Sequence, residues 1–168
     1  QRWDFHATCY RLYSDFKPPR NVPSQYLAFD QLRLRFLQGE PIIAGIVAPA
    51  EFGKSELLSA WMHFLASRGC KHQVCGVTGI AGTQLGGCTV HNLLSLRADG
   101  STDIQQHPER RRFVEELECI MIDEAFMAEE ALITAFTDVL RQFPLREDKR
   151  RRGALKKFGY RDVIFGGD

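Results

Sequence analysis

The sequence predicts an α/β fold in which a parallel central sheet lies between two layers of helices. Short apolar segments typical of buried strands alternate with longer segments whose apolar residues recur at helical spacing. Residues 42–77 have the order strand, loop, helix, strand, which is the unit from which parallel sheets are built. The 168 residues suffice for one domain that buries about two-thirds of its unfolded surface.

The first half of the chain supplies two expected strands and two helices. Residues 1–22 contain several prolines and are expected to form an irregular lead-in, after which Ser24 can cap a helix that ends near Gln38. The apolar run PIIAGIVA, residues 41–48, is expected to be a buried strand. A helix follows, with its apolar face at Leu57, Leu58, Trp61, Met62 and Leu65, and residues 73–77 are the next strand.

The second half continues the alternation. A short helix is expected around residues 90–96, and a further helix over 108–117 begins with Pro108 in its first turn. A strand over 118–122 comes next, and an amphipathic helix spans residues 132–143. A basic loop over 146–157 leads into a last strand over 162–165.

Composition excludes several classes of protein. Lysine and arginine number 22 against 21 acidic residues, so no global positive charge marks a nucleic-acid binder. The longest apolar run is well short of the roughly 20 residues of a membrane-spanning helix, and no signal segment opens the chain, which predicts a soluble intracellular protein. The sequence starts at Gln1 and stops after FGGD, and we therefore expect a fragment.

The cysteines favour neither disulfides nor a zinc site. Their number is odd and they lack paired spacing, which predicts reduced thiols, with Cys70 and Cys75 flanking the start of a strand. The five are Cys9, Cys70, Cys75, Cys88 and Cys119.

The stretch APAEFGKS, residues 48–55, lies between an expected strand and an expected helix, where a phosphate-binding loop belongs. Such a loop needs backbone N–H groups at a helix N-terminus, a lysine that reaches phosphate oxygens, and a hydroxyl for Mg²⁺. Gly53, Lys54 and Ser55 provide its end. Ala48 replaces the usual first glycine, and Glu51 brings a carboxylate close to the phosphates.

The stretch CIMIDE, residues 119–124, is a second signal of nucleotide chemistry. It is an apolar strand that ends in two acids, of which Asp123 can hold Mg²⁺ and Glu124 can orient or deprotonate water. Alone this Walker-B pattern is weak. On a separate strand downstream of GKS, it makes the interpretation as an NTPase specific.

Further stretches separate the classes of NTPase. VTGIAGTQLGGCTVHNL, residues 77–93, has no place in a GTPase or a small-molecule kinase, and the asparagines Asn21 and Asn92 form no guanine-reading motif. Together with SQYLAF, the GKS loop, IDEAFM and FGYRDVIFGGD, this stretch resembles the N-terminal half of a superfamily-one DNA helicase of the Pif-one type, especially the helicases of Helitron transposons. The resemblance covers residues 22–168.

This resemblance implies a RecA-like P-loop motor domain over residues 23–168, truncated at the third helicase motif. It implies ATP and Mg²⁺ as cofactors and single-stranded DNA as partner, in a monomer of the nucleus or another DNA-containing compartment, with roles in DNA repair, recombination and telomere maintenance. The missing second domain would supply arginine fingers, so we expect the fragment alone to be inactive.

The resemblance also assigns residues. Catalysis is assigned to Lys54 and Glu124, the metal to Ser55 and Asp123, and the third motif to Asp168. The residues expected to bind the nucleotide are Gln25, which matches the adenine-reading glutamine, and Ala50, Glu51, Phe52, Gly53, Lys54, Ser55 and Glu56. Those expected to contact single-stranded DNA are Thr78, Gly79, Thr89 and His91. Phe126 stands where the family usually has a small polar residue.

Several alternatives stay open from the sequence. His91 can equally be a polar residue on a short helix. The arginines at 110–112 are expected to pair with Glu115 and Glu116 rather than with DNA, whereas the basic residues 149–157 can serve either as solvated charges or as phosphate contacts. The parent protein is interpreted as an ATP-dependent DNA helicase or, alternatively, as a nonenzymatic nucleotide-binding relic of one.

Overall fold

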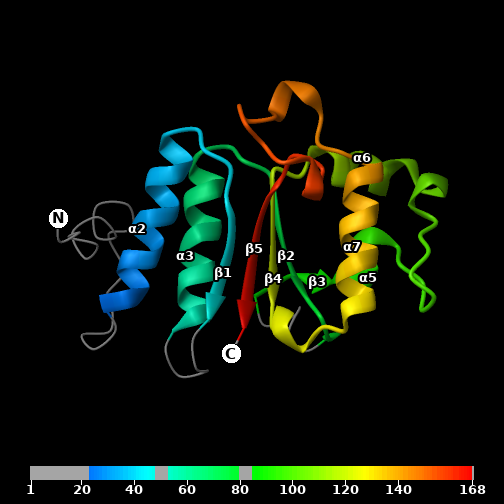
Figure 1. The fold of residues 1–168 in the computed structure, drawn as a ribbon, viewed down its shortest axis with the longest axis horizontal. Coiled ribbons are helices and arrows are strands. Elements are labelled where there is room, and N and C mark those ends of the chain that lie inside the picture. The colour runs from blue at the N-terminus through cyan, green and yellow to red at the C-terminus, as the bar shows by residue number, and fades with distance from the viewer. Residues whose placement is uncertain (1–22, 48–52, 80–84, 168) are drawn as a thin grey trace.

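The computed structural model describes residues 23–47, 53–79 and 85–167, and it has the three predicted layers (Figure 1). The strands are β1 (Ile43–Val47), β2 (His72–Gly76), β3 (Cys88–Thr89), β4 (Cys119–Asp123) and β5 (Asp162–Gly167). The α-helices are α2 (Pro23–Leu37), α3 (Lys54–Ser67), α5 (Val90–Leu94), α6 (Pro108–Glu116) and α7 (Glu130–Gln142). Short 3-10 turns cover Ile104–Gln106, Ala125–Met127, Glu147–Lys149 and Lys156–Phe158. Across these described ranges, no helix combines the length and apolarity needed to cross a membrane.

All paired strands of the sheet run parallel, in the order β1-β5-β4-β2-β3. β5 comes last in the sequence but lies between β1 and β4. The strands point the same way, so their carboxyl ends form one edge of the sheet, at the bottom of Figure 1. Ligands of such sheets bind at this edge. The predicted α/β class is confirmed.

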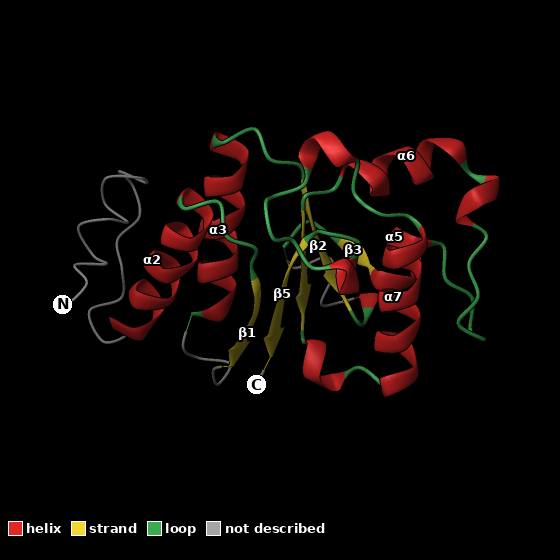
Figure 2. Ribbon diagram, turned by 45° about the horizontal axis from the view of Figure 1, so that its top comes forward, coloured by secondary structure: helices red, strands yellow, loops and turns green. Residues whose placement is uncertain are grey.

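Helices cover both faces of the sheet, which gives the domain two hydrophobic cores (Figure 2). Between α2, α3 and the sheet, Trp61 is buried and stacks on Phe64 with 4.9 Å between ring centroids, while Phe29 meets it edge-on. Trp61 is therefore a packing residue, as the sequence suggested. The other core lies between the sheet and the helices α5, α6 and α7, and includes Ile122 and Phe136.

Most element boundaries differ from the sequence-based expectation by one or two residues, and one strand was not expected. The first helix starts at Pro23, ahead of the expected Ser24 cap. β2 begins at His72, one residue earlier than predicted, so Cys75 lies inside the strand rather than beside its start. The two-residue strand β3 was not predicted. It forms because Gly87 lets the chain approach β2 so closely that a Cβ there would overlap the Val74 carbonyl.

The buried side chain of Arg161 links α6, α7 and the turn before β5. Its side chain is almost fully buried, and desolvation lowers the pKa of its guanidinium to about 10. The guanidinium donates hydrogen bonds of 2.5–3.5 Å to five backbone carbonyls. They belong to Val114, Leu117, Leu140, Phe143 and Phe158. Arg161 thus links the C-terminal ends of α6 and α7, where the Val114 carbonyl also accepts from the Leu117 N–H.

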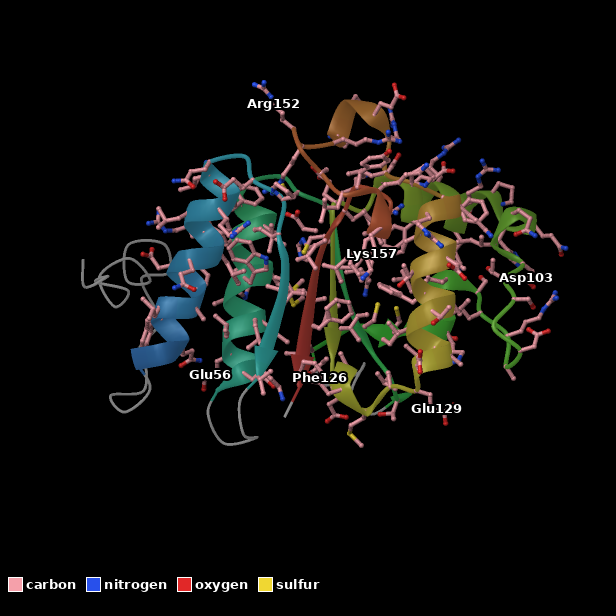
Figure 3. All side chains as sticks on the ribbon, viewed as in Figure 1. Glu56, Asp103, Phe126, Glu129, Arg152 and Lys157 are labelled. Carbon is pink, nitrogen blue, oxygen red and sulfur yellow. The ribbon has the colours of Figure 1, made fainter. Side chains whose placement is uncertain are left out.

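The basic segment 146–157 lies at the amino edge of the sheet, away from the carboxyl ends; Arg152 marks it at the top of Figure 3. Its arginines make contacts within the fold. Arg150 lies over the Tyr160 ring and Arg151 over the Phe36 ring, each with 4.1 Å from the guanidinium carbon to the ring centroid. The position and these contacts favour a structural role for the segment.

Arg151 also forms an ion pair with Asp162 at 3.2 Å. Asp162 is nearly buried and accepts a hydrogen bond of 2.9 Å from the Ile42 backbone N–H. Burial raises the pKa of the Asp162 carboxyl to about 6, although the Arg151 charge and the Ile42 hydrogen bond act in the opposite direction. Removing this carboxylate from water therefore costs more than its two partners return.

One arginine of α6 forms the pairing expected from the sequence, and a second has a different partner. Arg111 donates to the Glu115 carboxylate at 2.9 Å, one helical turn along. Arg110 instead donates to the Asn92 carbonyl and joins α6 to α5. Both arginines therefore have partners within the protein.

Candidate functional site

Asp123, predicted to bind the metal, and Thr89, predicted to contact DNA, lie in one row along the carboxyl edge of the sheet. Gly76 of β2 pairs with Asp123 of β4 on one side and with Thr89 of β3 on the other. The pairing of Ile122 with Phe165 places Asp123 beside Gly166 of β5. Since neighbouring strands lie about 4.8 Å apart, Asp123 and Thr89 are separated by roughly 10 Å along this edge.

The end of the GKS loop leads into a helix, at the place where the sequence predicts a phosphate-binding loop. Gly53 has φ +73° and lies next to Gln25, so any side chain there would be both strained and crowded. α3 begins at Lys54, whose side chain is buried, while Ser55 is exposed in the first turn. The free N–H groups and positive dipole end of a helix of this length favour an anion at this position.

Lys54 and Asp123 meet at Gly166. A Cβ built on Gly166 would lie 3.6 Å from Lys54 Cδ and 3.6 Å from Asp123 Oδ1. Gly166 thus lies between the predicted phosphate-binding lysine and the predicted metal-binding acid. The sequence analysis did not single out Gly166, although the Gly-Gly pair at the end of the last strand was the available signal.

Glu124 follows Asp123 in a strained backbone conformation. Its φ and ψ are +54° and +35°, a region that non-glycine residues seldom occupy and that costs on the order of 1–3 kcal/mol. Its backbone N–H donates to Asp123 Oδ1 at 2.9 Å, which orients the buried carboxylate. Strain of this kind is common at functional sites, and the role of Glu124 in activating water stays a prediction.

Gln25 links α2 to the GKS loop. Its Nε2 donates to the Gly53 carbonyl at 2.7 Å and to Glu56 Oε2 at 3.4 Å. The other amide atom, Oε1, is buried and has no hydrogen-bond partner among the residues described. Buried polar atoms are normally paired, so this oxygen fits an amino group of a bound ligand such as adenine.

The predicted DNA-binding residues flank the same edge. Thr78 and Gly79 are exposed directly after β2, and His91 is exposed on α5. Thr89 caps α5, because its Oγ1 accepts a 3.1 Å hydrogen bond from the Asn92 N–H. The two segments lie together because β2 and β3 are paired.

Phe126 has a packing role that the sequence could not show. Its ring covers Gly167, where a Cβ would overlap the ring, and its Cζ lies 3.8 Å from the Cβ position of Gly45. The residue is half exposed at the carboxyl edge, near the C-terminal end of β5 (Figure 3). The unusual phenylalanine is therefore matched by glycines on β1 and β5.

Several predicted site residues lie outside the described part of the chain, and their predicted roles stay predictions. They are Ala50, Glu51, Phe52 and Asp168. The described residues contain no group of three or more histidines, cysteines or acids that could hold a metal by themselves. Mg²⁺ needs no such group, since it is usually held by one or two protein ligands and by substrate phosphates, and Ser55 with Asp123 offers such a pair.

Comparison with known proteins gives a family and a fold. A family model described as PIF1-like helicase matches residues 29–168. The Pif1 helicase from Candida albicans has a TM-score of 0.68 at 19% identity, over 91% of this chain and 33% of that one. Bacteroides Pif1 bound to ssDNA has a TM-score of 0.60 at 21% identity, over 83% and 31%. No curated protein matches the sequence.

A further similar structure is the Pif1 helicase from Bacteroides in complex with ADP-AlF3 and ssDNA, with a TM-score of 0.64 at 20% identity, over 84% of this chain and 31% of that one. The chain spans about a third of the length of these solved helicases. They confirm the predicted RecA-like α/β fold. Since the family model extends over most of the sequence, this chain belongs to the PIF1-like helicase family.

Proposed function

We propose that residues 23–168 form the first motor domain of an ATP-dependent DNA helicase, in which ATP hydrolysis drives movement along single-stranded DNA. The observation that carries this proposal is the meeting of Lys54 and Asp123 at Gly166, with Glu124 directly following. Membership of the PIF1-like helicase family supports it, as do Bacteroides relatives solved with ADP-AlF3 and ssDNA.

Phosphoryl transfer needs groups that position the triphosphate and stabilise charge rather than a covalent intermediate. Lys54, at the start of α3, would hold the phosphates together with the helix N-terminus. Gln25 would accept a hydrogen bond from the adenine amino group through its unpaired Oε1. Glu124 would take a proton from the water that attacks the terminal phosphate.

Ser55 and Asp123 would hold Mg²⁺, which neutralises charge on the phosphate oxygens when it is bound. The Asp123 carboxylate is already oriented by the Glu124 N–H, so little rearrangement is needed for it to act as a ligand. We propose that the DNA backbone contacts Thr78, Gly79, Thr89 and His91, since these lie at the ends of β2 and β3, the two strands on one side of β4.

The functional test compares two substitutions in the longer protein that includes the second motor domain. Lys54→Ala should abolish both ATP binding and DNA-stimulated hydrolysis, because it removes the phosphate contact. Glu124→Gln should keep ATP bound while hydrolysis falls by about 10²-fold or more, because only the proton acceptor is lost. Isothermal titration and a phosphate-release assay measure the two properties.

Glu147→Gln is the matched control, since Glu147 is exposed in the basic segment at the opposite edge of the sheet and is not part of the site. Equal loss of ATP binding in Lys54→Ala and Glu124→Gln would contradict the separate roles. ATP binding without any DNA-stimulated hydrolysis in the unsubstituted protein would instead support the nonenzymatic relic, which Ala48 and Glu51 keep open.

We further propose that the parent protein acts as a monomer in the nucleus or another compartment that contains DNA, in DNA repair, recombination or telomere maintenance. Its membership of a DNA-helicase family supports this setting. Fluorescent tagging of the parent protein, together with size-exclusion chromatography, tests location and oligomeric state. Exclusion of the tagged protein from all DNA-containing compartments would contradict it.

A further inference from the structure

Two cysteines face each other across neighbouring strands. Cys75 of β2 and Cys88 of β3 are register partners in the parallel pair, and both thiols are free. Their side chains belong to the same core, between the sheet and α5. Paired strands lie about 4.8 Å apart, within the roughly 4.4–6.8 Å between Cα atoms that a disulfide requires. The backbone already holds the two residues at bonding range.

Two glycines keep β3 close to β2 at this position. Gly86 has φ +73°, and Gly87 lies so close to the Val74 carbonyl that no side chain fits there. On the other side, Thr89 pairs with Gly76 and caps α5. The approach of the two sulfurs is therefore fixed by the backbone on both sides rather than by a flexible loop.

The two thiols differ in character. A side-chain hydrogen bond from Cys75 and, secondarily, the charge of Arg110 lower the pKa of the Cys88 thiol to about 7, against the effect of partial burial. The same hydrogen bond, followed by burial, raises the pKa of the Cys75 thiol well above its ordinary value. Cys88 is thus the thiol that reacts first, as the nucleophile, and Cys75 is the thiol that reacts second.

A pocket gives small molecules access to Cys88. It has a volume of about 1140 Å³ and is lined, among others, by Gly86, Gly87, Cys88, His107 and Arg110. Cys75 is fully buried and does not line it. The glycines leave the approach to the Cys88 sulfur uncrowded, and Arg110 supplies positive charge beside it.

We propose that Cys75 and Cys88 form a redox-active pair, which hydrogen peroxide entering this pocket converts into a disulfide. The Cys88 thiolate attacks one peroxide oxygen, which breaks the O–O bond and gives a sulfenic acid and one water. The Cys75 sulfur then attacks the Cys88 sulfur and displaces the second oxygen as water. Two thiols lose two electrons and two protons, and one peroxide becomes two waters. Two equivalents of a small thiol reverse the reaction by exchange.

The disulfide would join β2 and β3 immediately before the residues that we propose for DNA contact, Thr78 and Thr89. Oxidation would then restrict the relative movement of these two segments. This consequence rests on the proposed function, whereas formation of the disulfide does not. The test below therefore measures the bond itself and needs neither nucleotide nor DNA.

The experiment treats the folded chain with hydrogen peroxide, blocks free thiols and maps the peptides by mass spectrometry. The expected product is a 75–88 disulfide with a mass loss of two hydrogens, and it should also form when Cys9, Cys70 and Cys119 are replaced by alanine. In Cys75→Ala, oxidised Cys88 should persist as a sulfenic acid that a 1,3-dione probe labels. Before oxidation, iodoacetamide at pH 7 should modify Cys88 about tenfold faster than Cys70, whose pKa burial raises.

Three results would overturn the proposal. They are preferential oxidation of Cys70 or Cys119, a reacted Cys88 that never bonds to Cys75 in the unsubstituted chain, and alkylation of Cys88 no faster than that of Cys70. Circular dichroism before and after oxidation shows whether the mapped product comes from the folded protein. The peptide map of the unsubstituted chain remains decisive if Cys75→Ala fails to fold.

Discussion

Asp162 shows how one residue couples the stability of this domain to pH. Its carboxyl is held among Ile42, Arg151 and the core, and its pKa in the folded protein is about 6 against an ordinary value of 3.8. Between these values the folded protein binds a proton that the unfolded chain does not. Lowering the pH through 6 therefore stabilises the folded form, and above pH 6 this contribution is lost.

The substitution Asp162→Asn should remove this pH dependence while keeping an oxygen for the Ile42 N–H. From pH 7 to pH 5, the free energy of unfolding of the unsubstituted protein should rise relative to that of the variant by about 1 kcal/mol. Urea titrations at pH 7, 6 and 5 measure the difference. Asp148→Asn, which changes an exposed carboxylate in the neighbouring basic segment, is the control. A difference that stays constant across these pH values would refute the role of Asp162.

At the scale of elements, Arg161 connects α6, α7 and the turn before β5, because its guanidinium donates to backbone carbonyls in all three. Its contribution differs from that of an exposed arginine because both the cation and the carbonyls are out of water. Removing one partner of a buried charged network leaves the rest unpaired.

Arg161→Met should therefore destabilise the domain by about 3–5 kcal/mol, although the methionine fills much of the same space. Arg152→Met, in the exposed part of the basic segment, should change the free energy of unfolding by less than about 0.5 kcal/mol. Chemical denaturation of both variants measures these values. A loss below 1 kcal/mol for Arg161→Met would show that the carbonyls find other partners.

Local sequence patterns predicted the long helices. They did not predict β3, whose formation depends on contact with residues distant in the sequence. α3 and α7 have apolar residues at helical spacing, and Pro108 marks the start of α6, so each was found. β3 has two residues and exists only because Gly87 fits against Val74. In the site, GKS and IDE revealed Lys54 and Asp123, but that Gly166 lies between them follows from strand order, which local patterns do not contain.

At the scale of the whole molecule, the chain covers about a third of the length of the solved Pif1 helicases. A helicase moves by opening and closing a cleft between two motor domains, and phosphoryl transfer is commonly accelerated about 10³ to 10⁵-fold by an arginine from a neighbouring element. By the proposed function, this chain supplies one wall of such a cleft.

Residues 1–168 alone should therefore unwind no DNA and show at most trace ATPase activity, even where they bind ATP. A forked-duplex assay beside a phosphate-release assay measures this, and the longer protein with its second motor domain is the positive control. An ATP-dependent rise in melting temperature would confirm that the short chain is folded and binds nucleotide. Strand separation by residues 1–168 would contradict the two-domain mechanism.

The position of β5 also affects how the protein is made. β1 is hydrogen-bonded only to β5 in the described sheet, yet about 115 residues of the chain lie between the end of one and the start of the other. During synthesis on the ribosome, α2, β1 and α3 emerge first, and β2, β3 and β4 follow. Before β5 is made, no strand joins β1 to the other group. The two halves can close only after the last strand emerges, because it inserts between them. Until then β1 has unpaired edges on both sides, and the nascent chain is most exposed to wrong pairing or to capture by chaperones.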